Sequence, residues 1–144
     1  MSAPTGARRR AREVAFRVAY QADLAGDAYP LAWDLRREHE DQLTPDQIEL
    51  IEALIAALAA RGPEIDHELV TAMEGRWTMA RLAATDRAVL RVGVAELLAR
   101  AGSPARVVID EAIEIARTFG SEESGRFVNG VLDRAARRLR PAEF

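Results

Sequence analysis

The chain has 144 residues, of which 49% are hydrophobic and 30% are charged. This length and composition predict one soluble globular unit and exclude a disordered tail. No apolar run approaches the roughly 20 residues that cross a bilayer, and no hydrophobic leader follows the N-terminal charges, so we expect a cytoplasmic protein without membrane contact. Cysteine is absent, which excludes disulfides, cysteine–zinc sites and cysteine nucleophiles.

The net charge of −3 hides an uneven distribution, and all 20 basic residues are arginines. Residues 1–20 carry five arginines and one glutamate, residues 21–75 carry three arginines and 13 acids, and residues 76–144 carry 12 arginines and nine acids. A GC-rich genome is a sufficient reason for the missing lysine, but it does not explain where the arginines lie. Basic ends around an acidic middle indicate an anionic partner.

Start and stop signals divide the first half of the chain into helices. After a loose tail over residues 1–6, Thr5 is a candidate cap for the first helix and Gly26 ends it. Thr44 is a second cap, because proline follows it at the first helical position. The predicted helices are residues 7–25, a short helix around Trp33, a helix from Thr44-Pro45 to Gly62-Pro63 and a short helix that ends at Gly75.

The second half restarts around Trp77 and is also helical. The predicted helices run from Thr85-Asp86 to near Gly102, from Ser103-Pro104 to Gly120, and from Ser121 to about Leu139. The first of these is apolar almost all round, so we expect it at the centre of the fold. Val107–Ile109 suggests a strand, but the apolar residues after it repeat at three and four, which favours a helix.

Asn129-Gly130 between apolar residues is a typical hairpin signal. Because helical spacing continues through it, we predict an in-helix glycine that allows close packing, at a cost of about 1 kcal/mol against alanine. The predicted fold class is therefore all-α, with about seven helices in two small packed bundles. We expect an N-terminal subdomain over residues 1–75 and a C-terminal subdomain over residues 76–144, joined in one compact unit.

Signals for catalysis are weak. The two histidines, His39 and His67, lie in unrelated contexts, and neither a phosphate-binding glycine loop nor a serine nucleophile motif is present. Asp110 and Glu114 lie one helical turn apart, but neighbouring arginines favour an ion-pair lattice over a carboxylate pair that performs chemistry. We predict no enzyme activity, no cofactor and no metal.

The first helix carries the most informative pattern. At about 100° per residue, one face spans about 120° and combines arginines with aromatics, while the opposite face is small and apolar. The residues of this mixed face are Arg8, Arg9, Arg12, Phe16 and Tyr20. Guanidinium groups neutralise phosphates and rings stack on unpaired bases, so the face suits single-stranded RNA. The alternative is that the rings pack against another helix and the arginines are merely solvated.

The last helix carries a second basic set, in which Arg126 lies beside Phe127 and further arginines follow. The helix dipole alone would favour arginines near this C-terminal end. The complete set is Arg126, Arg134, Arg137, Arg138 and Arg140.

Four segments, in the same order along the chain, resemble the NusB family of transcription antitermination factors. They are Arg8–Glu13 followed by Tyr20; Asp86–Arg91 with Glu96–Leu98; Pro104, Val107–Ala112 and Glu114–Ala116; and Ser124 with Phe127–Asp133. The resemblance implies an all-helical, non-enzymatic protein of two small bundles. It also implies binding of the boxA RNA element of ribosomal-operon transcripts together with the ribosomal protein NusE. Other Nus factors and RNA polymerase would complete the complex, which prevents premature termination.

By this resemblance the candidate RNA-contacting residues are Arg8, Arg9, Arg12, Tyr20, Glu123, Arg126 and Phe127. Asp86 is the candidate partner-binding residue, on the surface that would meet NusE. Glu123 resembles an acidic position near the RNA, where an anion weakens phosphate contact, so its replacement by glutamine should tighten RNA binding.

The chain departs from the family pattern at Ala95, Ala105 and Asp110, where other members often carry aromatic residues or asparagine. A partner surface built on those rings would differ here. Alternatives stay open: a homodimer, a helical protein–protein adaptor without RNA binding, or a NusB-like accessory domain related to RNA cytosine methyltransferases. The last is disfavoured, because nothing in this sequence could bind S-adenosylmethionine.

Overall fold

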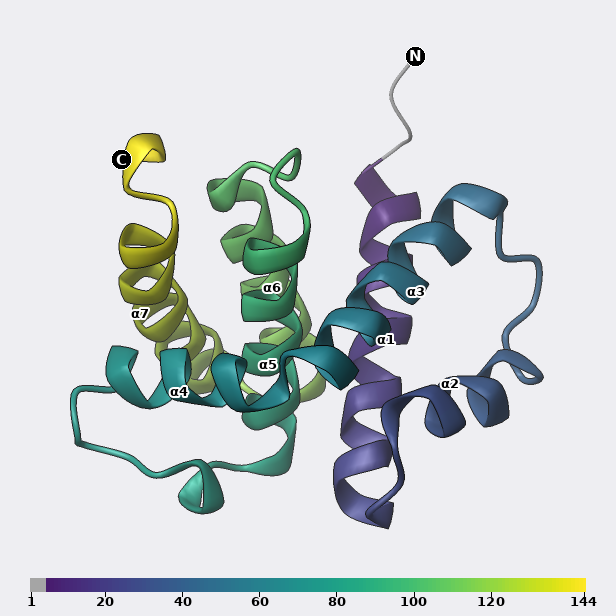
Figure 1. The fold of residues 1–144 in the computed structure, drawn as a ribbon, viewed down its shortest axis with the longest axis horizontal. Helices are drawn as coiled ribbons and strands as arrows, with labels where there is room; N and C mark the ends of the chain where they lie inside the picture. The colour runs from purple at the N-terminus through teal and green to yellow at the C-terminus, as the bar shows by residue number, and fades with distance from the viewer. Residues whose placement is uncertain (1–4) are drawn as a thin grey trace.

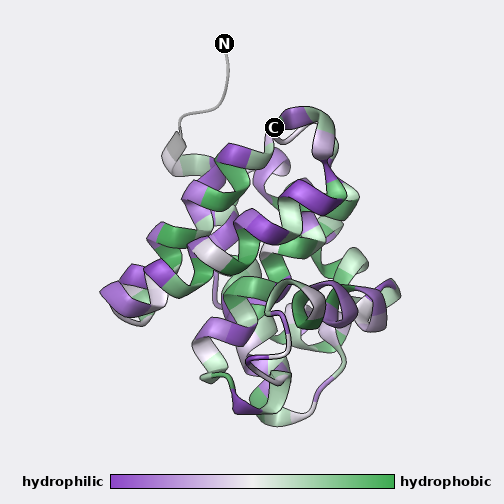
Figure 2. Ribbon diagram, turned by 90° about the vertical axis from the view of Figure 1, so that its left-hand side faces the viewer, coloured by the Kyte–Doolittle hydropathy of each residue, from purple (hydrophilic) through white to green (hydrophobic). Residues whose placement is uncertain are grey.

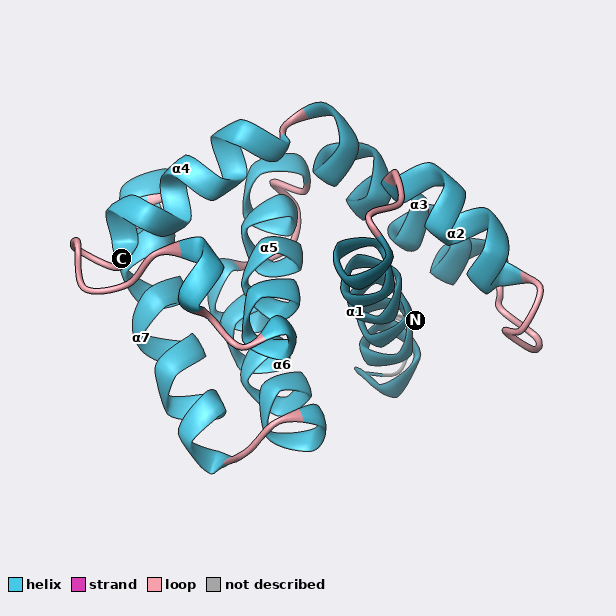
Figure 3. Ribbon diagram, turned by 90° about the horizontal axis from the view of Figure 1, so that it is seen from below, coloured by secondary structure: helices cyan, strands magenta, loops and turns pink. Residues whose placement is uncertain are grey.

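The computed structural model describes residues 5–144, which form seven α-helices and two short 3₁₀ turns (Figure 1). The helices are α1 (Thr5–Ala25), α2 (Tyr29–Arg37), α3 (Pro45–Ala60), α4 (Gly62–Ala72), α5 (Ala84–Ala99), α6 (Ala105–Phe119) and α7 (Glu122–Leu139), and the turns are η1 (Met79–Arg81) and η2 (Pro141–Glu143). Within residues 5–144 no strand occurs (Figure 3), so the all-α prediction is confirmed. The first four residues of the predicted tail lie outside the described part, and the prediction was wrong for its last two, because α1 already begins at Thr5.

Local signals account for several helix ends. Thr44 caps α3 in a reciprocal capping box: its hydroxyl accepts from the Gln47 N–H at 3.1 Å, and the Gln47 side chain accepts from the Thr44 N–H at 2.9 Å. Ser121 caps α7, and Gly26 follows α1 with a φ of 72°, a conformation that favours glycine. Gly62, predicted as a stop, is instead the first residue of α4.

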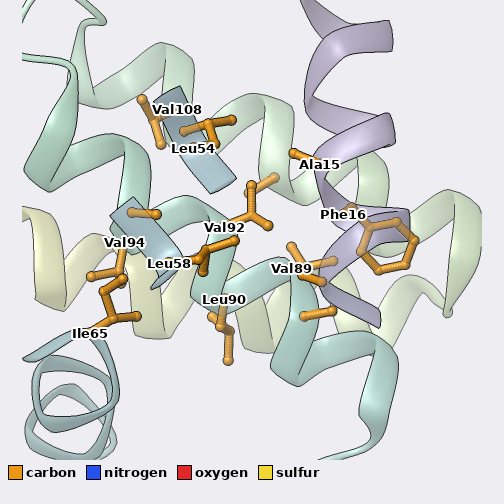
Figure 4. Close-up of a cluster of buried hydrophobic side chains, with 14 of the residues drawn as sticks. Ala15, Phe16, Leu54, Leu58, Ile65, Val89, Leu90, Val92, Val94 and Val108 are labelled. Carbon is orange, nitrogen blue, oxygen red and sulfur yellow. The ribbon is translucent and has the colours of Figure 1, made fainter. Parts of the chain in front are cut away.

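α5 is the centre of the packing, as its apolar sequence predicts. It contacts α1 and α3 on one side and α6 and α7 on the other, and α4 also packs against α5 and α7 (Figure 1). Val89, Leu90 and Val94 of α5 are buried in this core (Figure 4). Hydrophobic and hydrophilic residues alternate in bands along the helices (Figure 2), and none of the described helices is long and apolar enough to span a membrane.

Two glycines in the core helices differ in their surroundings. A Cβ on Gly93 in α5 would lie 2.9 Å from Cδ1 of the buried Leu132, so this side chain of α7 packs tightly against the α5 backbone there. A Cβ on Gly130 would meet only the end of the Arg134 side chain, at 3.6 Å. Residues 129–130 are helical as predicted, but the prediction of close packing at Gly130 was wrong. The packing contact is made by Gly93.

Candidate nucleic-acid interface

The N-terminal turn of α1 presents one exposed arginine. Arg8 is exposed and lines a hollow of about 360 Å³ beside the turn over residues 99–103. Arg9 is less available, because its Nε and Nη2 atoms donate to the Glu111 carboxylate at 2.8 and 3.1 Å. These hydrogen bonds raise the pKa of Arg9 above its ordinary value. Arg10 faces the segment before α3, where it donates to the carbonyl of Asp41.

Arg12 lies inside the protein and not on its surface. It is 4% exposed, and its Nε and Nη2 atoms donate to the two Glu96 carboxylate oxygens at 2.8 and 2.7 Å. Desolvation opposes the charged form of Arg12, but the hydrogen bonds and charge of Glu96 outweigh it and raise the pKa of Arg12. The expectation that Arg12 contacts RNA therefore needs correction, because Glu96 already occupies its donors. The pair ties α1 to α5.

The aromatic residues of α1 form one wall of a groove. Phe16 is buried, and its ring centroid lies 4.9 Å from that of Phe119 and 6.1 Å from that of Tyr20. Phe16 therefore packs against another helix, as the alternative interpretation predicted, while Tyr20 is half-buried at the surface. The guanidinium carbon of Arg17 lies 4.8 Å from the Phe119 ring centroid. These four side chains and the apolar Leu24 line a hollow of about 690 Å³, here called the α1 groove.

A second groove collects the predicted residues of the C-terminal half. Asp86 from α5, together with Glu123 and Phe127 from α7, lines a hollow of about 330 Å³, here called the Trp77 groove. Trp77 is 42% exposed, and its ring meets the Phe127 ring edge-on with centroids 5.8 Å apart. The guanidinium carbon of Arg81 lies 5.5 Å from the Trp77 ring centroid. Arg126 precedes Phe127 and is exposed.

The two grooves are neighbours at the start of α5, because Thr85 lines the α1 groove and the next residue, Asp86, lines the Trp77 groove. The predicted residues are thus spread over three places. Tyr20 lies in the first groove; Asp86, Glu123 and Phe127 line the second; and Arg8 lies apart at the N-terminal end of α1.

Sequence reasoning missed Trp77, Arg81 and Phe119 as surface residues beside these grooves. The segment from Arg76 to Arg81 does carry a signal, because two arginines flank a tryptophan just after a glycine turn. The family departures fall mostly inside the protein: Ala95 and Ala105 are buried, and only Asp110 is exposed.

Most arginines are neutralised by carboxylates. Glu114, for example, pairs with Arg117 at 2.8 Å. The arginines that form no ion pair with a described carboxylate are Arg8, Arg17, Arg76, Arg81 and Arg126. Apart from Arg8, each of them stacks on or adjoins in sequence an aromatic residue of one of the grooves. Across residues 5–144 no group of three potential metal ligands is found.

Comparison with known proteins identifies the family to which this chain is similar. The model of the NusB family matches residues 9–137. The transcription antitermination protein NusB of Anaeromyxobacter dehalogenans (strain 2CP-1) is 41% identical over 138 residues, which cover 96% of each chain. The corresponding protein of Saccharopolyspora erythraea is 43% identical over 132 residues, covering 91% of this chain and 87% of that one.

Solved structures agree with this result. NusB of T. maritima has a TM-score of 0.86 at 33% identity and covers 99% of this chain and 97% of that one. A crystal structure of the antitermination factors NusB and NusE in complex with dsRNA contains a chain with a TM-score of 0.81 at 29% identity, covering 92% of this chain and 97% of that one. The protein therefore belongs to the NusB family.

Proposed function

We propose that this protein is a cytoplasmic transcription antitermination factor that binds single-stranded boxA RNA of ribosomal-operon transcripts together with NusE. Other Nus factors and RNA polymerase would complete the assembly that prevents premature termination. Relatives 41% and 43% identical are named transcription antitermination proteins, and a similar chain is found in complex with NusE and dsRNA.

The observation that carries the RNA proposal is the location of the unpaired arginines. Four of the five, all but Arg8, stack on or adjoin in sequence an aromatic residue of two adjoining grooves. These grooves also hold half-buried or exposed aromatic rings, such as Tyr20 and Trp77. Guanidinium groups neutralise backbone phosphates, and aromatic rings stack on bases that are not paired. A surface that combines both matches a flexible single strand.

The contact with NusE is proposed at the start of α5. Asp86 is half-buried there and forms no ion pair with the described residues, so its carboxylate is available to a partner's cation. Leu24, at one end of the adjoining α1 groove, is 60% exposed, and a bound protein segment would remove this apolar surface from water.

Binding to a short single-stranded boxA RNA tests the proposal, measured against a scrambled strand and a boxA duplex, with and without NusE. We expect the boxA strand to bind best and NusE to strengthen it. Neutralisation of about four phosphates predicts a log–log salt dependence with a slope of about −3. Failure to bind RNA in every condition, with NusE still bound, would leave a protein–protein adaptor.

A further inference from the structure

We propose that the Trp77 groove is a pocket for one unpaired RNA base, in which Trp77 is the stacking surface and Glu123 accepts hydrogen bonds from the base edge. The proposal rests on the proposed RNA binding and assigns one part of the RNA to one place on the protein. Guanine is the base that this groove fits best.

The stacking surface is an indole that the fold leaves in water. Trp77 is 42% exposed, whereas the other tryptophan, Trp33, is 4% exposed and donates its indole N–H to Glu52 at 3.0 Å. Trp77 lies in the segment between α4 and α5, and its edge-on contact with Phe127 fixes the ring against α7. A ring that is held in place and still exposed can stack on a base with little loss of conformational entropy.

The size of the groove suits a single base. Its volume of about 330 Å³ is near the lower end of the roughly 300–1,000 Å³ typical of small-ligand pockets. Phe127 closes one side and Arg81 rests on the Trp77 ring, so the aromatic surface is confined to one site and does not continue as a long stacking platform.

The polar lining indicates that a base edge, and not a phosphate, enters the groove. Asp86 and Glu123 both line it, and neither forms an ion pair or side-chain hydrogen bond with the described residues. Ionised carboxylates only accept hydrogen bonds and repel phosphate. Guanine presents two adjacent N–H donors on its Watson–Crick edge, N1–H and the N2 amino group, which match the two oxygens of one carboxylate. Uracil presents one.

The cations around the groove suit the flanking phosphates. Arg81 lies over Trp77, and Arg126 precedes Phe127 on the exposed side of α7; neither pairs with a described carboxylate. When a base covers the indole, the Arg81 guanidinium is displaced from the ring toward the strand. The arrangement thus places acceptors inside the groove and cations at its rim.

The first test uses the wild-type protein and its own fluorescence. Titration with single-stranded boxA RNA should quench the Trp77 emission, and Trp77→Phe should remove the quenching while the buried Trp33 still emits. RNA that binds without changing Trp77 emission would overturn the pocket and leave the proposed function intact. Absence of RNA binding in any form would overturn the proposed function and the pocket with it.

Affinity measurements on variants complete the test. Trp77→Ala should weaken binding about 5- to 150-fold, the equivalent of 1–3 kcal/mol per stacked base, and Trp77→Tyr should restore most of it. Phe144→Ala is the matched control, because Phe144 is 40% exposed and also stacks on arginines but lies outside both grooves. Wild-type affinity in a folded Trp77→Ala, or equal loss in Phe144→Ala, would contradict the proposal.

Base preference tests the role of Glu123. Strands that differ only by guanine, adenine or uracil at one position should show a preference for guanine at a single position in the wild type. Loss of the Glu123 charge should tighten binding to every strand, but Glu123→Gln should reduce the preference for guanine at least several-fold. Glu122→Gln should keep the preference, because Glu122 pairs with Arg117 and does not line the groove. An unchanged preference in Glu123→Gln would overturn guanine recognition by this carboxylate.

Discussion

Removal of one partner of the buried Arg12–Glu96 ion pair should destabilise the protein far more than removal of both. The two side chains are 5% and 1% exposed and share two hydrogen bonds of 2.8 and 2.7 Å. Hydrogen bonds to charged groups contribute roughly 1.5–3 kcal/mol each, and a broken buried pair costs about 3–5 kcal/mol. Glu96→Gln should therefore lower the free energy of unfolding by about 3–5 kcal/mol.

The double variant Arg12→Met/Glu96→Leu leaves no buried charge at either of these two positions, so its stability should fall near that of the wild type or above it. Urea denaturation followed by circular dichroism measures both effects, and Glu114→Gln, which removes an exposed pair with Arg117, should cost at most about 1 kcal/mol. A loss below about 1 kcal/mol in Glu96→Gln would refute the energetic argument. A stable double variant with tenfold weaker RNA binding would place Arg12 on the RNA.

Three further predictions follow from particular contacts. Gly130→Ala should stabilise the protein by up to about 1 kcal/mol, and Gly93→Ala should destabilise it by about 1–3 kcal/mol, both measured by urea denaturation. The opposite order would contradict the tight contact between Gly93 and Leu132. Hydrogen bonds from the Ala105 N–H and, to a lesser extent, from Arg140 lower the pKa of Glu143. The Glu143 carboxylate therefore stabilises the folded protein fully above about pH 4.5, and this contribution is lost as the pH falls further. Below that pH the Tm of Glu143→Gln should accordingly fall less than the Tm of the wild type. An equal fall in both proteins would refute this role of Glu143. Arg126→Gln should weaken RNA binding and reduce the slope of the log–log salt dependence by about 0.7. Arg137→Gln should change neither, because Arg137 already pairs with Asp133 at 2.9 Å. Equal effects of the two substitutions in a filter-binding assay would count against the role of unpaired arginines.

The features predicted correctly from sequence are those set by neighbouring residues. The caps at Thr44 and Ser121 and the end of α1 at Gly26 depend on contacts within about four residues. The helical state of residues 129–130 depends on apolar spacing, which outweighed the local hairpin signal. These signals are readable because both partners of each contact lie in the same short segment.

The candidate site was less predictable, because the exposure and ion pairing of its residues depend on partners that are distant in the sequence. A helical wheel places Arg12 beside Arg8, but only the fold brings Glu96, 84 residues away in sequence, to its guanidinium. The Trp77 groove combines the segment before α5, the start of α5 and the start of α7, and none of these alone predicts a hollow. Close packing was predicted at Gly130 and not at Gly93 for the same reason, since the residue that packs against Gly93 is Leu132 of another helix.

Terminator readthrough in a purified transcription reaction tests the central claim most directly. The reaction would contain RNA polymerase, NusE and the other Nus factors, with templates that carry either boxA or a scrambled element ahead of a terminator. Addition of this protein should increase readthrough on the boxA template alone, and Trp77→Ala should reduce the increase. Equal readthrough on both templates, or no increase on the boxA template, would contradict the assignment as an antitermination factor.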